Sequence, residues 1–124
     1  MNAMAGTVTD ADLADIGAYF ASQRKMKSSG LAVNKQGEDV FLNSDLTRSR
    51  YACVGCHGQN GKGSGPKAAM YPVIGGQHKE YILKQLLDFR AAYRVNSPNN
   101  IMNTVTKKMT DEEIEAVAEY VSAQ

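Results

Sequence analysis

The chain has 124 residues, with 14 basic and 13 acidic side chains and a formal net charge of +1. This balance gives no reason to expect binding to nucleic acid or to an anionic membrane, and no apolar run approaches membrane-spanning length. A chain this short forms one domain with room for a small appendage, and it buries a limited apolar core.

The first predicted helix begins after Thr9, because Thr9-Asp10-Ala11-Asp12 has the pattern of a capping box. A stripe of apolar residues follows at helical spacing, at Leu13, Ile16, Gly17 and Phe20. Near the other end, Thr110 opens a helix with a matching stripe at Ile114, Val117, Ala118 and Val121. We interpret this as an internal repeat, in which residues 1–22 are the last helix of a preceding domain of the same kind. Two amphipathic helices that merely look alike are the alternative.

Residues 23–35 are polar around Ser28-Ser29-Gly30 and are predicted to be a linker. The domain proper is expected to span residues 36–124. It begins with a short helix over residues 36–43, which carries Gly37, Val40 and Phe41.

The most informative stretch is Cys53-Val54-Gly55-Cys56-His57, which contains both cysteines of the chain. Two cysteines three positions apart, with a histidine directly after the second, form the attachment pattern of c-type haem. On one turn of helix both thiols lie on the same side, where each can form a thioether with a haem vinyl group. His57 then directs its imidazole at the iron as the proximal ligand.

Three other interpretations of the two cysteines are weaker. A redox dithiol requires a strand before the motif and a helix after it, and no strand-rich pattern is present. A zinc site could use both cysteines with His57 and His78, but adjacent Cys56 and His57 fit tetrahedral ligand spacing poorly. A disulfide between Cys53 and Cys56 would be strained and would close a very small loop. The motif therefore favours one covalent haem c.

The rest of the chain predicts short helices and loops. Residues 58–66 contain too many glycines for regular structure, and we attribute them to backbone that passes close to a haem. Residues 71–77 are expected to be extended, and the longest helix is expected over residues 79–95. Residues 96–100 break this helix, Ile101 and Met102 follow in a loop, and the last helix covers residues 111–122. The predicted fold class is all-α.

Several residues beyond the motif resemble those of class I c-type cytochromes, in particular one domain of the tandem, dihaem cytochrome c4 family. The matching positions are Cys53, Cys56, His57, Gly58, Pro72, Ile74, Gly76, Gln77, Tyr81, Gln85, Leu86, Phe89, Arg90 and Met102. The resemblance covers residues 36–124 and implies a cytochrome c fold wrapped around one covalently bound haem. The tandem domains of that family agree with the repeat interpretation of residues 1–22.

The resemblance also implies roles for residues outside the motif. Met102 would be the distal iron ligand through its thioether sulfur, in preference to Met70 or Met109. Pro72 would offer its carbonyl oxygen to the ring N–H of His57. Four residues are candidates to contact the haem propionates: Gln77, Tyr81, Arg90 and Arg94.

Filling both axial positions of the iron with His57 and Met102 leaves no open site for a substrate, and a thioether ligand raises the reduction potential. The implied function is a one-electron carrier rather than an enzyme, and the resemblance suggests a quinol-oxidising complex and a terminal oxidase as partners. Because haem c is attached outside the cytoplasm, we expect a periplasmic location. The alternatives are a haem domain of a larger oxidoreductase and a haem-based gas or redox sensor.

The distribution of charge along the sequence bears on the redox partner. Between residues 46 and 108, two acidic residues, Glu80 and Asp88, stand against ten basic ones. The basic residues are Arg48, Arg50, Lys62, Lys67, Lys79, Lys84, Arg90, Arg94, Lys107 and Lys108. This excess predicts either an ordinary solvated surface or a positive surface that steers a partner with an acidic docking face.

Overall fold

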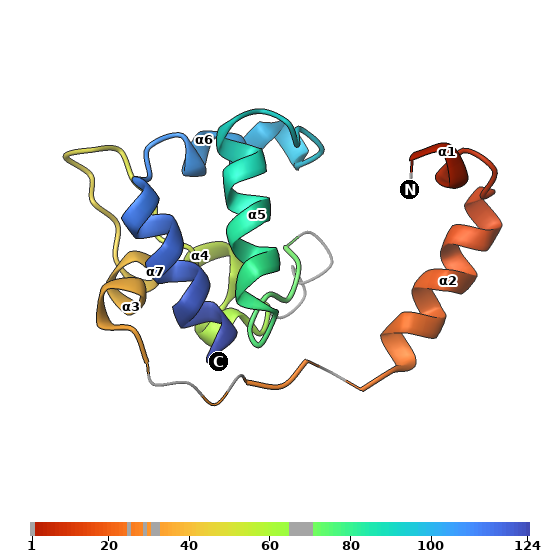
Figure 1. Ribbon diagram of the computed structural model, residues 1–124, viewed down its shortest axis with the longest axis horizontal. Coiled ribbons are helices and arrows are strands. Elements are labelled where there is room, and N and C mark those ends of the chain that lie inside the picture. Colours follow the sequence, from red (N-terminus) through yellow and green to blue (C-terminus); the bar gives the residue numbers. More distant parts are fainter. Residues whose placement is uncertain (1, 25, 29, 31–32, 65–70) are drawn as a thin grey trace.

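The computed structural model describes residues 2–24, 26–28, 30, 33–64 and 71–124, and the sequence expectations for Lys67 and Met70 lie outside this range (Figure 1). The described residues contain helices and loops and no β-strand, with one isolated bridge between Asp45 and Arg50. The predicted all-α fold class is therefore confirmed. No described helix combines the length and the apolar character needed to traverse a bilayer.

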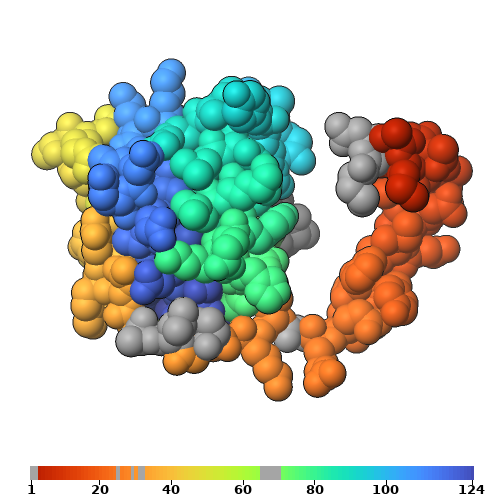
Figure 2. All heavy atoms as spheres, in the orientation of Figure 1, coloured from red at the N-terminus to blue at the C-terminus, as the bar shows by residue number. Residues whose placement is uncertain are grey.

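Two N-terminal helices, α1 (Asn2–Ala5) and α2 (Asp10–Ser22), lie apart from the rest of the described chain (Figures 1 and 2). The capping box predicted at Thr9 is present, because the Thr9 hydroxyl accepts from the amide of Asp12 and the Asp12 carboxylate accepts from the amide of Thr9. The apolar stripe of α2 is exposed in the described chain. No residue of α2 is buried, since the helix makes no extensive contact with another described helix.

The remaining helices form a C-terminal body, which we define as residues 35–124. Its elements are α3 (Lys35–Leu42), α4 (Val54–His57), η1 (Gln59–Gly61), α5 (Lys79–Arg90), η3 (Pro98–Asn100), α6 (Ile101–Thr106) and α7 (Asp111–Ser122). Both α3 and α5 pack against α7, and α6 packs against α5 (Figure 1). Helix α7 therefore lies at the centre of the body.

Two predicted boundaries are wrong. The helix predicted over residues 79–95 ends at Arg90, because Ala92 has a left-handed φ of 59° that α-helix cannot continue through. With 12 residues α5 is shorter than α2, which has 13, so the expectation that it is the longest helix is also wrong. Ile101 and Met102 lie in helix α6 rather than in a loop. Left-handed backbone at Asn99 and Asn100 turns the chain into this helix, and asparagine tolerates that conformation better than most residues.

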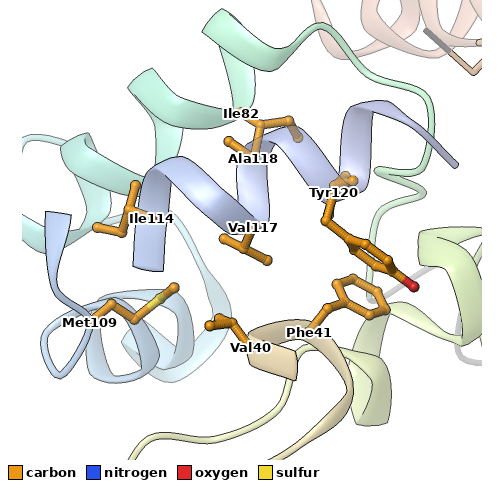
Figure 3. Close-up of a cluster of buried hydrophobic side chains, with 9 residues drawn as sticks. Val40, Phe41, Ile82, Met109, Ile114, Val117, Ala118 and Tyr120 are labelled. Atoms are coloured by element: carbon orange, nitrogen blue, oxygen red, sulfur yellow. The ribbon is translucent and has the colours of Figure 1, made fainter. Parts of the chain in front are cut away.

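The core forms where α3 crosses α7. At Gly37 the two backbones approach so closely that a Cβ atom would overlap the carbonyl oxygen of Ala116. The rings of Phe41 and Tyr120 pack beside this point, with their centroids 5.3 Å apart (Figure 3). The buried cluster contains Val40, Phe41, Ile82, Met109, Ile114, Val117, Ala118, Tyr120 and Val121. The best-packed part of the fold therefore lies around α7, between α3 and α5.

An ion-pair cluster around the buried residues Arg50 and Glu113 joins the loop before α4 to the first turn of α7. Arg48 donates to both carboxylate oxygens of Glu113 over 2.8 and 3.1 Å, and Arg50 Nε lies 3.3 Å from Glu113 Oε1. Arg50 also donates to the carbonyl oxygens of Val40 and Asn43, which fastens the same loop to α3. Burial by itself raises the pKa of Glu113, but hydrogen bonds from Arg48 and Thr110 and the two arginine charges outweigh it, so the pKa is lowered.

The Glu113 cluster predicts a specific pH dependence of stability. Because the pKa of Glu113 is lower in the folded state, its contribution is present above the ordinary glutamate pKa and is lost as pH falls through the lowered value. We expect Glu113→Gln to reduce the free energy of unfolding at neutral pH by about 1–3 kcal/mol. It should also flatten the loss of stability in acid. Urea unfolding of both proteins across a pH series measures this, and parallel pH curves would contradict it.

Candidate functional site

A cavity of about 630 Å³ opens in the C-terminal body between α4, residues 71–77, α5, α6 and α7. Most of its lining is apolar. The apolar side chains come from α5, α6 and α7 and from the segment before α5, namely Ile74, Ile82, Leu86, Phe89, Ile101, Val105, Val117 and Val121. Cys53, Cys56, His57 and Met102 also line this cavity, so the fold brings together side chains far apart in sequence.

Cys53 is the residue before helix α4, and Cys56 and His57 lie in the helix, so both cysteines and the histidine fall within one turn. This turn is closed by the amide of His57, which donates to the carbonyl oxygen of Cys53 over 3.0 Å. The amide of Cys53 in turn donates to the carbonyl oxygen of Phe41 over 3.0 Å, which anchors the motif to the core of α3 and α7. The motif is therefore held by the best-packed part of the molecule.

The surroundings of the cysteines disfavour the other interpretations of the motif. Both cysteines are free, so no disulfide joins them. Burial raises the pKa of the Cys53 thiol to about 11, whereas a redox-active dithiol needs a thiolate near neutral pH. The described residues also contain no group of three or more His, Cys, Asp or Glu side chains arranged to hold a metal ion.

His57 is buried, and the backbone fixes its ring. Its Nδ1 lies 2.9 Å from the carbonyl oxygen of Pro72. A carbonyl oxygen only accepts hydrogen bonds, so Nδ1 carries the proton and donates. The lone pair is consequently left on Nε2, the atom available to a metal.

The segment that carries Pro72 is itself tied to the glycine-rich loop. The amides of Ile74 and Gly75 both donate to the carbonyl oxygen of Gly61, over 2.8 and 2.9 Å. A Cβ at Gly75 would overlap the carbonyl oxygen of Asn60, and a Cβ at Gly58 would overlap that of Gly63. In the described part of the loop, the glycines thus permit contacts between backbone segments, which is a different role from the passage beside a haem that we expected.

The described methionines differ in their surroundings. Met102 lines the cavity from α6, whereas Met109 is buried in the cluster with Val40 and Ile114 and does not line it (Figure 3). Of these two methionines, Met102 therefore shares the cavity with His57 and Met109 does not.

Three of the four residues expected at the propionates line the cavity, namely Gln77, Tyr81 and Arg94. Arg90 does not. Its guanidinium donates to the carbonyl oxygen of Met109 and pairs with Asp111, so the structure holds it elsewhere.

Gln85 and Asn96 are polar lining residues that the sequence analysis did not assign. Arg94 Nη1 donates to Gln85 Oε1 over 2.6 Å, and Arg94 Nε donates to Asn96 Oδ1 over 2.9 Å. The Arg94 guanidinium also stacks on the Phe89 ring, 4.4 Å from its centroid. The position of Gln85 on an otherwise apolar helix face, four residues after Tyr81, was the signal that could have identified it.

Folding neutralises much of the basic excess found along the sequence. Arg48 pairs with Glu113, Lys79 with Glu115 and Glu119, Lys84 with Asp88, and Arg90 with Asp111. Four of these five carboxylates come from α7, outside the stretch in which the charges were counted. The basic and acidic side chains that are separated along the sequence are thus paired in the folded structure.

The chemistry of this cavity fits a haem. A porphyrin needs a large apolar site with a polar region for its two carboxylates, and the lining provides both. Two thiols on one helical turn match the two vinyl groups, while an imidazole and a thioether are the ligand types found on haem iron in electron-transfer proteins.

Comparisons with known proteins agree with this chemistry. The protein-family model described as Cytochrome c matches residues 35–124. Cytochrome c4 of Stutzerimonas stutzeri is 41% identical over 98% of this chain and 58% of its own length. The crystal structure of reduced recombinant cytochrome c4 from Pseudomonas stutzeri has a TM-score of 0.85 and 40% identity, covering 97% of this chain and 63% of that one. The Acidithiobacillus ferrooxidans cytochrome c4 structure also has a TM-score of 0.85, with 33% identity over the whole of this chain and 70% of that one. The chain thus spans about three-fifths of the length of the curated relatives it matches.

The packing of the glycine-rich loop predicts that Gly75→Ala is destabilising. The added Cβ would push the segment carrying Pro72 away from Asn60, and we expect a loss of about 1–3 kcal/mol in the free energy of unfolding. Gly55→Ala is the matched control, because nothing lies within 4 Å of its Cβ position. Denaturant unfolding of both variants checks this, and equal midpoints would show that the two segments are not packed as described.

Proposed function

The chain belongs to the cytochrome c family, and on that premise we propose that it is a one-electron carrier whose haem iron is ligated by His57 and Met102. One haem c is attached to the domain through Cys53 and Cys56. The observation that carries the proposal is that the Pro72-oriented imidazole and the Met102 thioether line one cavity with both cysteines.

When bound, the haem supplies an iron that alternates between the ferric and ferrous states. The protein contributes rigidity and electrostatics. Pro72 holds the His57 ring in one tautomer and orientation, and the soft sulfur of Met102 favours the ferrous state and so raises the reduction potential. Apolar side chains of α5 and α7 would shield the bound haem from water. If His57 and Met102 both hold the iron, no position would be left open to a substrate, and the arrangement would support electron transfer.

A second hollow beside the motif supports a docking surface for redox partners. It has a volume of about 430 Å³ and is lined mainly by apolar groups, including Tyr51, Val54, Ile101 and Val105, together with Cys56. Tyr51 and Ile101 are exposed. A small apolar surface next to an attachment cysteine suits a brief encounter in which a partner approaches the haem edge.

The proposed partner presents an acidic docking face, and the structure suggests where it binds. Lys107 and Lys108 are exposed and directly follow α6, whose residues Ile101 and Val105 line the hollow. Among the described residues, neither lysine forms an ion pair. These charges remain available to attract an acidic surface, unlike the paired bases on α5.

Domain organisation and location follow from the same proposal. Residues 1–22 are the last helix of a preceding cytochrome-like domain, and residues 23–35 are a linker. The exposed apolar face of α2 and the capping box it shares with α7 support this interpretation. The electron carrier works in the periplasm, between a quinol-oxidising complex and a terminal oxidase.

Carbon monoxide tests the axial ligation. Because Met102 fills the distal position, the reduced protein should show no spectral change with carbon monoxide. Met102→Ala should keep its covalent haem and bind carbon monoxide readily, while Met109→Ala should behave as the parent protein does. A carbon monoxide complex of the parent protein would favour instead a haem domain of a larger oxidoreductase, or a gas sensor.

Salt dependence tests the docking surface. We expect oxidation of the reduced protein by hexacyanoferrate(III), a trianion, to slow as salt is added, and replacing Lys107 and Lys108 by glutamine to flatten this dependence. Lys84→Gln is the control, because this lysine is paired with Asp88. Equal salt slopes in all three proteins would remove the two lysines from the docking surface.

A further inference from the structure

We propose that Asn103 is a positioning residue for the distal iron ligand. Its side-chain amide fastens α6 to the end of α5 and so holds Met102 in place over the cavity. This inference rests on the proposed ligation by His57 and Met102.

Helix α6 needs such a fastening because it is short. It has six residues and is entered through the left-handed residues Asn99 and Asn100. A helix of this length is unstable by itself, so contacts with the rest of the protein must determine its position. The same contacts therefore determine the position of an iron ligand carried by α6.

The Asn103 amide supplies the contact. Its Nδ2 donates to the carbonyl oxygen of Phe89 over 2.7 Å and to that of Arg94 over 2.8 Å. Phe89 lies in the last turn of α5, and its carbonyl oxygen also accepts from the amide of Ala92 over 3.2 Å. Both Phe89 and Arg94 also line the cavity, so one side chain ties the ligand-bearing helix to the cavity wall.

The amide oxygen of the Asn103 side chain indicates that the hydrogen-bond donor is the group that matters. Asn103 Oδ1 is buried and has no hydrogen-bond partner among the described residues, which costs free energy. Turning the amide over would place Oδ1 against two carbonyl oxygens and is worse. The fold thus accepts an unpaired oxygen in order to keep two donated hydrogen bonds.

The remaining hydrogen bonds near Met102 are local. The amide of Met102 donates to Ser97 Oγ over 3.2 Å, and its carbonyl oxygen accepts from Thr106 Oγ1 over 2.8 Å. These bonds shape α6 and its entry without reaching α5. Within the described residues, the side-chain hydrogen bond from α6 to α5 comes from Asn103.

Imidazole binding to the ferric haem protein tests the inference, because imidazole must displace Met102. We expect Asn103→Ala to bind imidazole roughly tenfold more tightly than the parent protein, since two hydrogen bonds that resist displacement are lost. Alanine favours helix, so α6 itself should persist. Asn103→Asp keeps the shape but loses the donor, and it should bind imidazole at least as tightly as Asn103→Ala.

Val40→Ala serves as the structural control. It removes core packing between α3 and α7 and should lower stability to urea while leaving imidazole affinity unchanged. Parent-like imidazole affinity in both Asn103 variants, or an equal shift in Val40→Ala, overturns the proposal. The ferric parent protein must also show the charge-transfer band of thioether-ligated haem. Its absence would refute ligation by Met102 itself, whereas its presence with unchanged imidazole binding refutes only the role of Asn103.

Discussion

The close crossing of α3 and α7 at Gly37 is the contact on which the haem domain depends. It brings Phe41 against Tyr120, and the carbonyl oxygen of the same Phe41 receives the amide of Cys53. The haem-attachment turn is therefore bonded directly to the most tightly packed part of the core. The first turn of α7 adds Glu113, which holds Arg48 and Arg50 and with them the loop leading to that turn. The position of the haem-attachment turn is therefore determined by packing in the core of α3 and α7.

The two sides of the cavity are held in different ways. On the His57 side, one backbone carbonyl orients the imidazole, and the carbonyl of Gly61 fixes the segment that provides it. On the Met102 side, the supporting helix is a short one, fastened through side chains. A side-chain substitution leaves the backbone groups of a loop in place, whereas one substitution removes the side-chain amide of Asn103. We therefore regard the methionine side as the more adjustable half of the site.

The features that the sequence predicts correctly are those that depend on residues close together in the chain. The haem motif and both capping boxes are encoded within a few residues, so their spacing suffices to identify them. The missed features depend on contacts between distant segments. Helix α5 ends at Arg90 near the carbonyls that Asn103 binds, α6 forms where a loop was expected, and α7 carboxylates neutralise basic residues many positions away. Arg90 is an example. The family resemblance implied that it contacts a haem propionate, whereas its partners in the structure are the carbonyl oxygen of Met109 and the carboxylate of Asp111.

The placement of both thioether positions within the single turn of residues 53–57 has a consequence for refolding. A denatured molecule keeps its pigment tethered, so the prosthetic group is never diluted into solvent. Collapse around it is then an intramolecular event governed by local concentration, and its rate is independent of how much haem the solution contains. A globin-like pocket, which loses its cofactor on denaturation, must instead recapture it in a second-order encounter.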